Sequence, residues 1–308
     1  MADGSRTAVI EAQADAAAAE AAREAKAEIL ARSDMSDMEV ASARTLPSPK
    51  RSKAAAKAQW AEFTVDVWIT PFNSVEFGIY KHSRNRAKSR QFTTDMDIFA
   101  EIIEKGERTG LLGYREDLWR KNTGMDKRLV FKLFNETVNW RATMDLMIGR
   151  SLQLTLGARG LPVTCFSINV GDHDNMVYLE RSANKWPLLP ENFSFFLLED
   201  GKLRFFRLRR DFIDLGGDYT LYNHHNQKIG NLDGRVFSIG GKWTGRVKSE
   251  YADPHLLVVL KLFCGMLIFN DDARRHMRAL ARDVAAGKYE PKLEKQEADL
   301  YMNPRRVR

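Results

Sequence analysis

The sequence predicts an α+β protein whose C-terminal half is an antiparallel β-barrel enclosing an apolar helix. Three observations predict this class. Residues 193–249 repeat short strand patterns with turn residues between them, residues 255–269 are almost wholly apolar, and Asp253-Pro254 separates the two stretches. A helix that is apolar all round must be surrounded by other structure, and a curled sheet provides that surrounding.

Strong turn signals bound the strand patterns. Phe193–Glu199 and Lys202–Arg209 flank Asp200-Gly201, a two-residue loop typical of hairpins because both turn positions favour positive φ. Repeated short strands with turn chemistry at each break predict a meander in a sandwich or barrel. The other expected strands are Leu152–Leu156, Val163–Val170, Met176–Leu179, Tyr219–Tyr222, Lys228–Leu232, Arg235–Ile239 and Lys242–Ser249, with turns at Asp233-Gly234 and Gly240-Gly241.

Asp253 and Pro254 predict the start of the apolar helix, at 254–269. Aspartate is a favoured N-cap, and proline is favoured at the first helical position. The apolar run has roughly 14 residues, short of the 20 or so that span a bilayer, so we expect a buried core helix. Lys261 is its one charged residue, and we expect its ammonium to pair with an acid or to reach the end of the barrel. Asn270-Asp271-Asp272 predicts a second helix, over 273–286.

Residues 59–150 predict a smaller mixed α/β region before the barrel at 151–287. Phe63–Ile69 alternates as a half-buried strand does, and Val75–Tyr80 is a second apolar piece. A capped helix is expected to start at Thr94 or Asp95, with Ile98, Phe99, Ile102 and Ile103 at helical spacing. Met125–Met147 is compatible with a helix or with strands. Residues 1–58, rich in alanine and basic residues, and the charged residues 288–308 are expected to be disordered tails.

The strand pattern after residue 217 resembles a known family. Gly217–Gly230 (GDYTLYNHHNQKIG) and Asn231–Trp243 (NLDGRVFSIGGKW) are similar to the strand–turn–strand units of tubby C-terminal-like domains, which include LURP-one-related proteins and phospholipid scramblases. The apolar run 255–269 resembles the helix that threads the barrel in that family. The resemblance covers about 193–286. It departs from the scramblases, because neither a cysteine-rich lipidation segment nor a calcium-loop acidic cluster is found, so scramblase activity is not implied.

The amino-acid composition indicates a class of binding partner but does not identify a particular one. The 308 residues carry a formal net charge of +7 and a pI of about 9.3, which favours anionic partners. The only two cysteines, Cys165 and Cys264, lie in apolar runs and read as small buried hydrophobes in a reducing compartment. No signal peptide or transmembrane segment is predicted. We therefore expect a cytoplasmic protein, with a peripheral position at a membrane as the alternative.

Two basic segments are the candidate anion-binding sites. Arginines on one expected strand, interleaved with Phe205 and Phe206, could bind phosphate through planar guanidinium groups; exposed charges that protect a strand edge are the alternative. These arginines are Arg204, Arg207, Arg209 and Arg210. A basic loop at 81–90 could meet anionic lipid or RNA, or be a solvated loop; its charged residues are Lys81, Arg84, Arg86, Lys88 and Arg90.

No catalytic motif, cofactor or metal site is expected. Asp172-His173-Asp174 and His224-His225 read as turns, because neighbouring side chains on an extended loop cannot all face one ion. The leading hypothesis is a non-enzymatic binding or scaffold module that contacts anionic phospholipid or a protein partner. The alternatives are a basic protein associated with nucleic acid or ribonucleoprotein, and an enzyme whose site the sequence does not reveal.

Overall fold

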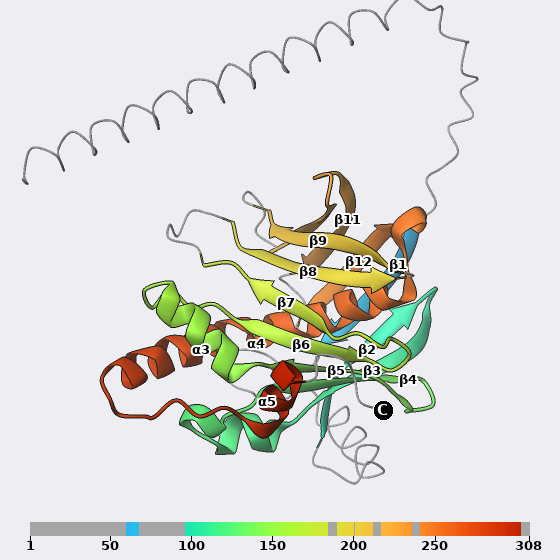
Figure 1. The fold of residues 1–308 in the computed structure, drawn as a ribbon. Helices are drawn as coiled ribbons and strands as arrows, with labels where there is room; N and C mark the ends of the chain where they lie inside the picture. The colour runs from blue at the N-terminus through green and yellow to red at the C-terminus, as the bar shows by residue number, and fades with distance from the viewer. Residues whose placement is uncertain are drawn as a thin grey trace, which may run out of the picture. The chain divides into compact units, whose positions relative to one another are not determined.

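The computed structural model describes residues 60–67, 96–183, 190–199, 201–211, 217–235 and 241–302. They belong to one compact unit, Lys57–Arg308. Their strands close into an antiparallel barrel in the order β1-β12-β11-β10-β9-β8-β7-β6-β5-β4-β3-β2 (Figure 1). The strands are β1 (Trp60–Val67), β2 (Asp97–Glu104), β3 (Glu107–Tyr114), β4 (Val130–Asn135), β5 (Trp140–Leu146), β6 (Cys165–Val170), β7 (Val177–Arg181), β8 (Asn192–Glu199), β9 (Lys202–Arg210), β10 (Tyr219–Asn223), β11 (Lys228–Arg235) and β12 (Lys242–Lys248). The helices are α3 (Ile148–Gly157), α4 (Pro254–Ala285) and α5 (Lys295–Met302), with short helical turns η2 (Asp117–Lys121), η3 (Gly124–Asp126) and η4 (Ser249–Tyr251).

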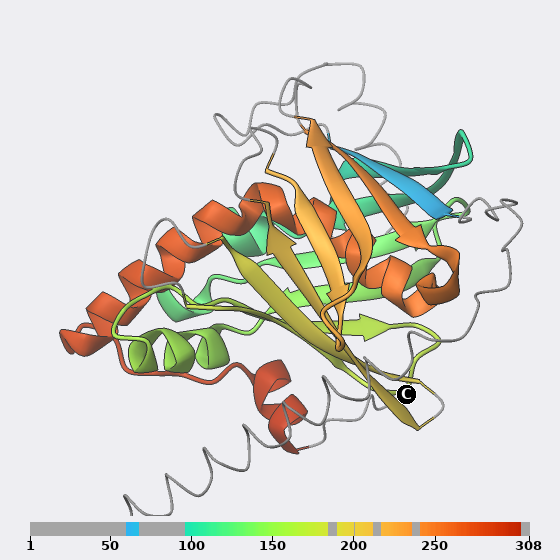
Figure 2. The same ribbon diagram turned by 90° about the horizontal axis from the view of Figure 1, so that it is seen from above.

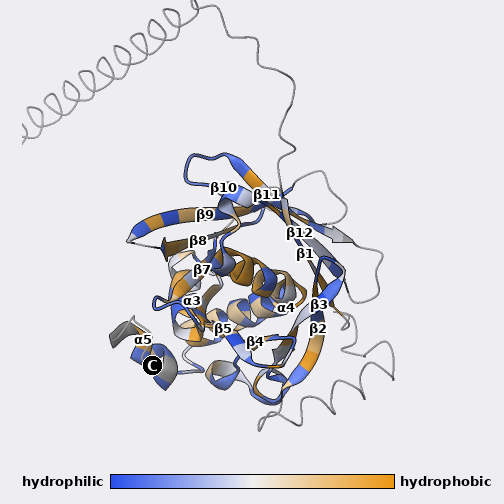
Figure 3. Ribbon diagram, turned by 90° about the vertical axis from the view of Figure 1, so that its right-hand side faces the viewer, coloured by the Kyte–Doolittle hydropathy of each residue, from blue (hydrophilic) through white to orange (hydrophobic). Residues whose placement is uncertain are grey.

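Strands from opposite walls of the barrel contact helix α4. The ring of Phe263 lies 5.0 Å from that of Phe193 on β8 and 5.1 Å from that of Tyr219 on β10. Phe269 contacts Phe131 of β4, with ring centroids 5.2 Å apart. Because β4 and β10 are six places apart in the closed order of twelve strands, these contacts reach both sides. Figure 3 shows the ring of strands around α4, and the predicted fold class is confirmed.

The hairpins around the predicted turns form, with one exception. β8 pairs with β9 across the Asp-Gly turn, where Gly201 has φ +72°, and β10 pairs with β11. The turn expected at Asp233-Gly234 is wrong, because β11 continues through these residues. Gly234 pairs with Trp243 of β12, so the two strands stay together to Arg235. The next turn falls outside the described residues, as do most of the expected strand Arg235–Ile239 and Gly240.

Residues 97–104 form strand β2, so the helix expected to begin at Thr94 or Asp95 is wrong. The apolar spacing that imitates a helix comes from a strand buried on both faces. Phe99 and Ile102 belong to the main core, whereas Ile98 belongs to a separate small cluster with residues of β3 and β4. Two register shifts in the pairing of β2 with β3 add to the irregular spacing. The alternative reading of Met125–Met147 as strands is the observed one, since β4 and β5 lie there.

The barrel includes the region expected to stand apart at 59–150. β5 pairs with β6, and β1 pairs with both β2 and β12. The first five strands therefore complete the same closed sheet, and the boundary expected near residue 150 is corrected. Leu152–Leu156, expected as a strand, lies in helix α3. This helix connects two neighbouring barrel strands and lies beside α4 (Figure 2).

Helix α4 begins as predicted but runs much further than expected. Asp253 is its N-cap, with Oδ1 accepting a hydrogen bond of 2.7 Å from the backbone N–H of His255. The break expected at Asn270 is absent, because the Asn270 side chain is buried and donates to Glu191 instead of capping a new helix. The second expected helix, 273–286, is the continuation of α4 to Ala285.

The C-terminal segment expected as a tail contains helix α5. Its Glu297 is buried, and its carboxylate accepts hydrogen bonds from the backbone N–H groups of Gly149 and Arg150 at 2.9 and 2.6 Å. Residues 1–59, 68–95 and 303–308 lie outside the described residues, and with them the expected N-terminal tail and the basic loop at 81–90. In the described part of the chain, every helix is too short or too polar to cross a membrane.

Candidate functional site

The four candidate arginines of β9 do not share one face of the sheet. Side chains alternate along a strand, so Arg204 and Arg210 share the parity of Phe206 and Leu208, which are buried in the barrel. Arg204 is paired with Glu199, with Nη1 3.1 Å from Oε2. Arg207 and Arg209 project from the outer face. The expectation of one arginine cluster is therefore corrected to two pairs on opposite faces.

The outer face of the β8–β9 hairpin carries an exposed apolar group next to Arg207 and Arg209. Phe196 is 52% exposed, Leu198 37% and Leu203 65%. Leu198 pairs with Leu203 close to the turn. Phe196 pairs with Phe205 two residues further along each strand, with ring centroids 5.0 Å apart. We call these four side chains the hairpin patch. Among the described residues, seven large apolar side chains are this exposed, and three of them belong to the patch.

Arg207 and Arg209 lie along the same outer face as the patch, further from the turn. Arg207 pairs with Tyr222 of β10, and its guanidinium lies 5.3 Å from the centre of the tyrosine ring. It also donates a hydrogen bond to the Asn226 side chain. Arg209 is exposed. The outer face therefore presents apolar side chains at the turn and cationic side chains behind them.

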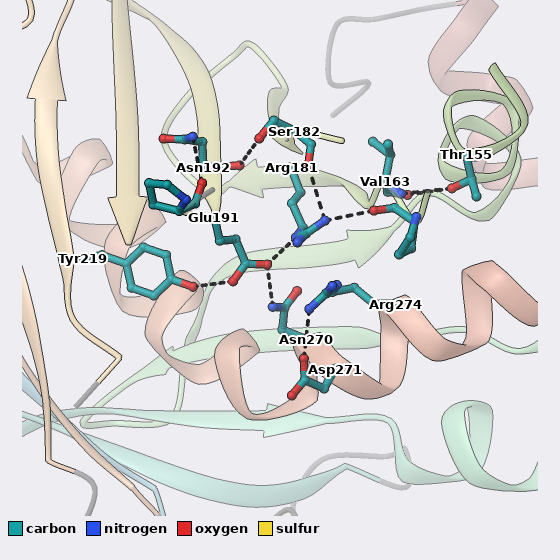
Figure 4. Close-up of polar contacts among 12 residues, drawn as sticks. Thr155, Val163, Arg181, Ser182, Glu191, Asn192, Tyr219, Asn270, Asp271 and Arg274 are labelled. Carbon is teal, nitrogen blue, oxygen red and sulfur yellow. Dashed lines mark hydrogen bonds and ion pairs between the residues drawn. The ribbon is translucent and has the colours of Figure 1, made fainter. Parts of the chain in front are cut away.

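A buried polar network ties the middle of α4 to the barrel wall (Figure 4). Arg181 of β7 is paired with Glu191, whose carboxylate also accepts hydrogen bonds from Tyr219 at 2.8 Å and from Asn270 at 3.0 Å. Burial raises the pKa of Glu191, but Arg181 and the hydrogen bonds outweigh it and hold that pKa below the usual range. Arg181 also donates to the backbone carbonyl of Pro162 at 2.9 Å. The Asn270 side-chain oxygen is buried without a hydrogen-bond partner among the described residues. Because the charges of Arg181 and Glu191 compensate each other, we interpret the network as structural.

A group of carboxylates and histidines gathers where α4 begins. Glu199 ends β8, Asp253 and His255 begin α4, and their ligand atoms lie within 4.8 Å of one another. His255 Nε2 lies 3.5 Å from Asp172 Oδ1. The ring of His173 packs against that of His255, with centroids 4.6 Å apart. We call these five residues the carboxylate–histidine cluster.

A cavity of about 590 Å³ adjoins this cluster. Asp172 and His255 line it, together with apolar side chains of β2, β4 and α4 and the charged pair Glu104–Lys261. Lys261 Nζ lies 2.9 Å from Glu104 Oε1, and the lysine side chain is only 12% exposed. The expectation that Lys261 forms a structural pair is confirmed. Burial raises the pKa of Glu104, but the ammonium of Lys261 outweighs it, so that pKa lies below its usual value.

No protein-family model, curated protein or solved structure matches this chain.

Reasoning from sequence found the arginines but missed the carboxylate–histidine cluster. The sequence predicts a turn at Asp172-His173-Asp174 and gives no reason to connect it with His255, since 82 positions separate His173 from His255. Only the closure of the barrel brings the β6–β7 turn, the end of β8 and the start of α4 together. The available signal was the position of two polar residues, Asp253 and His255, at the start of the predicted helix.

Proposed function

We propose that this protein is a non-enzymatic binding module that docks on anionic phospholipid surfaces through the hairpin patch and its arginines. The observation that carries the proposal is the grouping of Phe196, Leu198 and Leu203 at the turn with Arg207 and Arg209 behind them on one exposed face. Apolar side chains at a turn can enter the boundary between headgroups and acyl chains, as interfacial helices do. Arginines at the level of the headgroups then meet phosphate.

The energies are those of reversible docking. Full burial of a large apolar side chain contributes about 1.5–3 kcal/mol, so a half-exposed one contributes about 1 kcal/mol. Each arginine near an anionic surface adds about 1 kcal/mol. Three apolar side chains and two arginines therefore give roughly 5 kcal/mol of gross attraction, enough for weak, composition-dependent binding.

We also propose that the barrel is a tubby C-terminal-like domain. Two observations support this assignment: the similarity of the strand–turn–strand units at 217–243 to that family, and the position of α4 among strands of both barrel walls. The resemblance implies a binding domain, in agreement with the docking proposal. It does not identify which residues of this chain would contact lipid.

Flotation of the full-length protein with vesicles tests the docking proposal. We expect binding to phosphatidylcholine vesicles that contain phosphatidylserine, and much weaker binding to phosphatidylcholine alone. Changing Phe196→Ser together with Leu203→Ser should weaken binding about thirtyfold, since roughly 2 kcal/mol of apolar transfer is lost. Arg209→Gln should weaken binding to the anionic vesicles only.

The matched control is Leu156→Ser, which removes a 41% exposed leucine from α3, away from the patch. It should bind as the unchanged protein does. Equal binding to both vesicle types, or an equal loss in the control, contradicts the proposal. Binding to RNA that falls steeply with salt and survives the Phe196→Ser, Leu203→Ser change would favour the nucleic-acid alternative.

A further inference from the structure

The carboxylate–histidine cluster contains more hydrogen-bond acceptors than donors. Arg204 satisfies Oε2 of Glu199, and the backbone N–H of His255 satisfies Oδ1 of Asp253. Glu199 Oε1 and His255 Nδ1 are buried and have no hydrogen-bond partner among the described residues. Buried acceptors of this kind normally have a partner. The Glu199 and Asp253 carboxylates face each other closely enough to hydrogen-bond through a shared proton, and a cation between them can take the place of that proton.

The orientation of His255 leaves one ring nitrogen free to act as a ligand. Its Nε2 faces the Asp172 carboxylate at 3.5 Å, and a proton on Nε2 directed at Asp172 would leave Nδ1 as the ligand atom. Nδ1 lies 3.2 Å from Asp253 Oδ1, so in that tautomer a cation between the two atoms relieves the repulsion of two acceptors. A carboxylate on the far nitrogen of a histidine is the usual outer-shell support of a metal ligand.

A second imidazole beside the cluster is also without a partner. His173 is 7% exposed, and its Nε2 is buried with no hydrogen-bond partner in the described part of the chain. Its ring is inclined by 34° to that of His255. This nitrogen is a second unpartnered polar atom beside the cluster, on a residue other than the three whose ligand atoms lie within 4.8 Å of one another.

We propose that the carboxylate–histidine cluster binds one divalent transition-metal ion of the zinc type. Glu199 Oε1, the Asp253 carboxylate and His255 Nδ1 are its protein ligands, which leaves the fourth position for water or a further molecule. Two oxygens and one imidazole nitrogen suit such an ion better than calcium or magnesium, which take oxygen ligands alone. Three protein ligands and an open position are typical of sites where the metal meets a further molecule.

Distance and charge are both compatible with this ion. Tetrahedral zinc with bonds of about 2.0–2.1 Å places its ligands about 3.3 Å apart. The ligand atoms now lie within 4.8 Å of one another, so metal binding requires their separations to shorten. Two positive groups repel a cation at this position. The N-terminal end of the α4 dipole is equivalent to about +0.5 charge, and the Arg204 guanidinium adds one full positive charge. The three carboxylates of Asp172, Glu199 and Asp253 outweigh both.

Titration of the full-length, metal-free protein with Zn²⁺, followed by calorimetry, tests the proposal, with Co²⁺ as a visible-absorption probe of the ligand set. We expect one equivalent to bind. Glu199→Gln keeps the side chain's shape and should weaken binding at least a hundredfold, as should His255→Gln. Asp172→Asn should weaken it between tenfold and a hundredfold, because it removes only the support of His255.

Two controls separate this site from others. Glu250→Gln changes an exposed carboxylate on η4, and His225→Gln changes an exposed histidine at the β10–β11 turn, whose neighbour His224 could make a rival site. Both should bind as the unchanged protein does. Binding that survives Glu199→Gln, that is lost in His225→Gln, or that is absent from the unchanged protein overturns the proposal. Circular dichroism without metal identifies any misfolded variant, and Glu199→Gln alone decides the matter if His255→Gln fails to fold. The vesicle result is independent of this outcome.

Discussion

At the scale of single residues, Glu191 neutralises the buried charge of Arg181 inside the protein. The residue is buried with Arg181, Tyr219 and Asn270 as its partners. Removing one partner of a buried ion pair leaves the other charge without compensation, which costs more than the pair itself contributes. Glu191 therefore affects stability through the charge that it neutralises on Arg181.

We predict that Glu191→Gln lowers the free energy of unfolding by about 3–5 kcal/mol. The pKa of Glu191 in the folded protein lies below its ordinary value, so its contribution is present above the pKa of the unfolded chain and is lost as pH falls through the folded value. Urea denaturation at neutral and acidic pH measures both effects. The variant should lose less stability on acidification than the unchanged protein.

Glu136→Gln is the matched control, because Glu136 is exposed at the β4–β5 turn. It should change the free energy of unfolding by less than about 0.5 kcal/mol. A similarly small change in Glu191→Gln would show that Arg181 finds another partner, and the role assigned to Glu191 would then be wrong.

At the scale of elements, α5 caps a helix that is distant in sequence. The Glu297 carboxylate binds the backbone N–H groups of Gly149 and Arg150, at the start of α3. The first N–H groups of a helix lack partners within it, and a negative charge there also interacts favourably with the helix dipole. α3 has no side-chain cap from its own N-cap residue, Met147, so α5 supplies the cap.

We predict that Glu297→Ala destabilises the protein by about 1–2 kcal/mol, the usual cost of a lost N-cap. Thermal unfolding followed by circular dichroism measures the change. Amide hydrogen exchange in α3 should rise more than exchange in β9 or β10. Glu290→Ala, an exposed glutamate just before α5, should leave both measurements unchanged, and an equal effect in the two variants would exclude the capping role.

At the scale of the whole described molecule, closure joins the two halves of the chain. β1 pairs with β2 on one side and with β12 on the other, and β5 pairs with β6. The strands within residues 97–146 and those within 192–248 therefore belong to one continuous hydrogen-bonded sheet. A closed sheet loses hydrogen bonds on both sides when one of its strands leaves, which favours cooperative unfolding.

We predict that residues 97–146 and 192–248 unfold in one transition. Hydrogen exchange measured by mass spectrometry at increasing urea should show both segments losing protection at the same concentration, together with the loss of far-ultraviolet circular dichroism. Loss of protection in 97–146 at a clearly lower concentration would instead indicate two separate domains divided near residue 150.

How far the sequence predicted these features depends on the range of the interactions. Local chemistry was sufficient for the Asp-Gly hairpin turn and for the helix start at Asp253-Pro254, since both depend on neighbouring residues. It failed at Ile98 and Phe99, whose spacing suggested a helix although they are buried on different faces of a strand. It also failed at Asn270, where a residue that usually ends helices is satisfied by Glu191 from another strand.

The sequence by itself determined that an apolar helix must be enclosed, because water cannot cover residues 255–269 at an acceptable cost. It also determined that β strands with polar turns would enclose it. Only the tertiary structure decided which strands close the barrel, on which face each arginine lies, and that Glu199, Asp253, His255 and His173 meet. These outcomes depend on strand register and on closure, which set distances between residues far apart in the chain and leave no trace in local residue patterns.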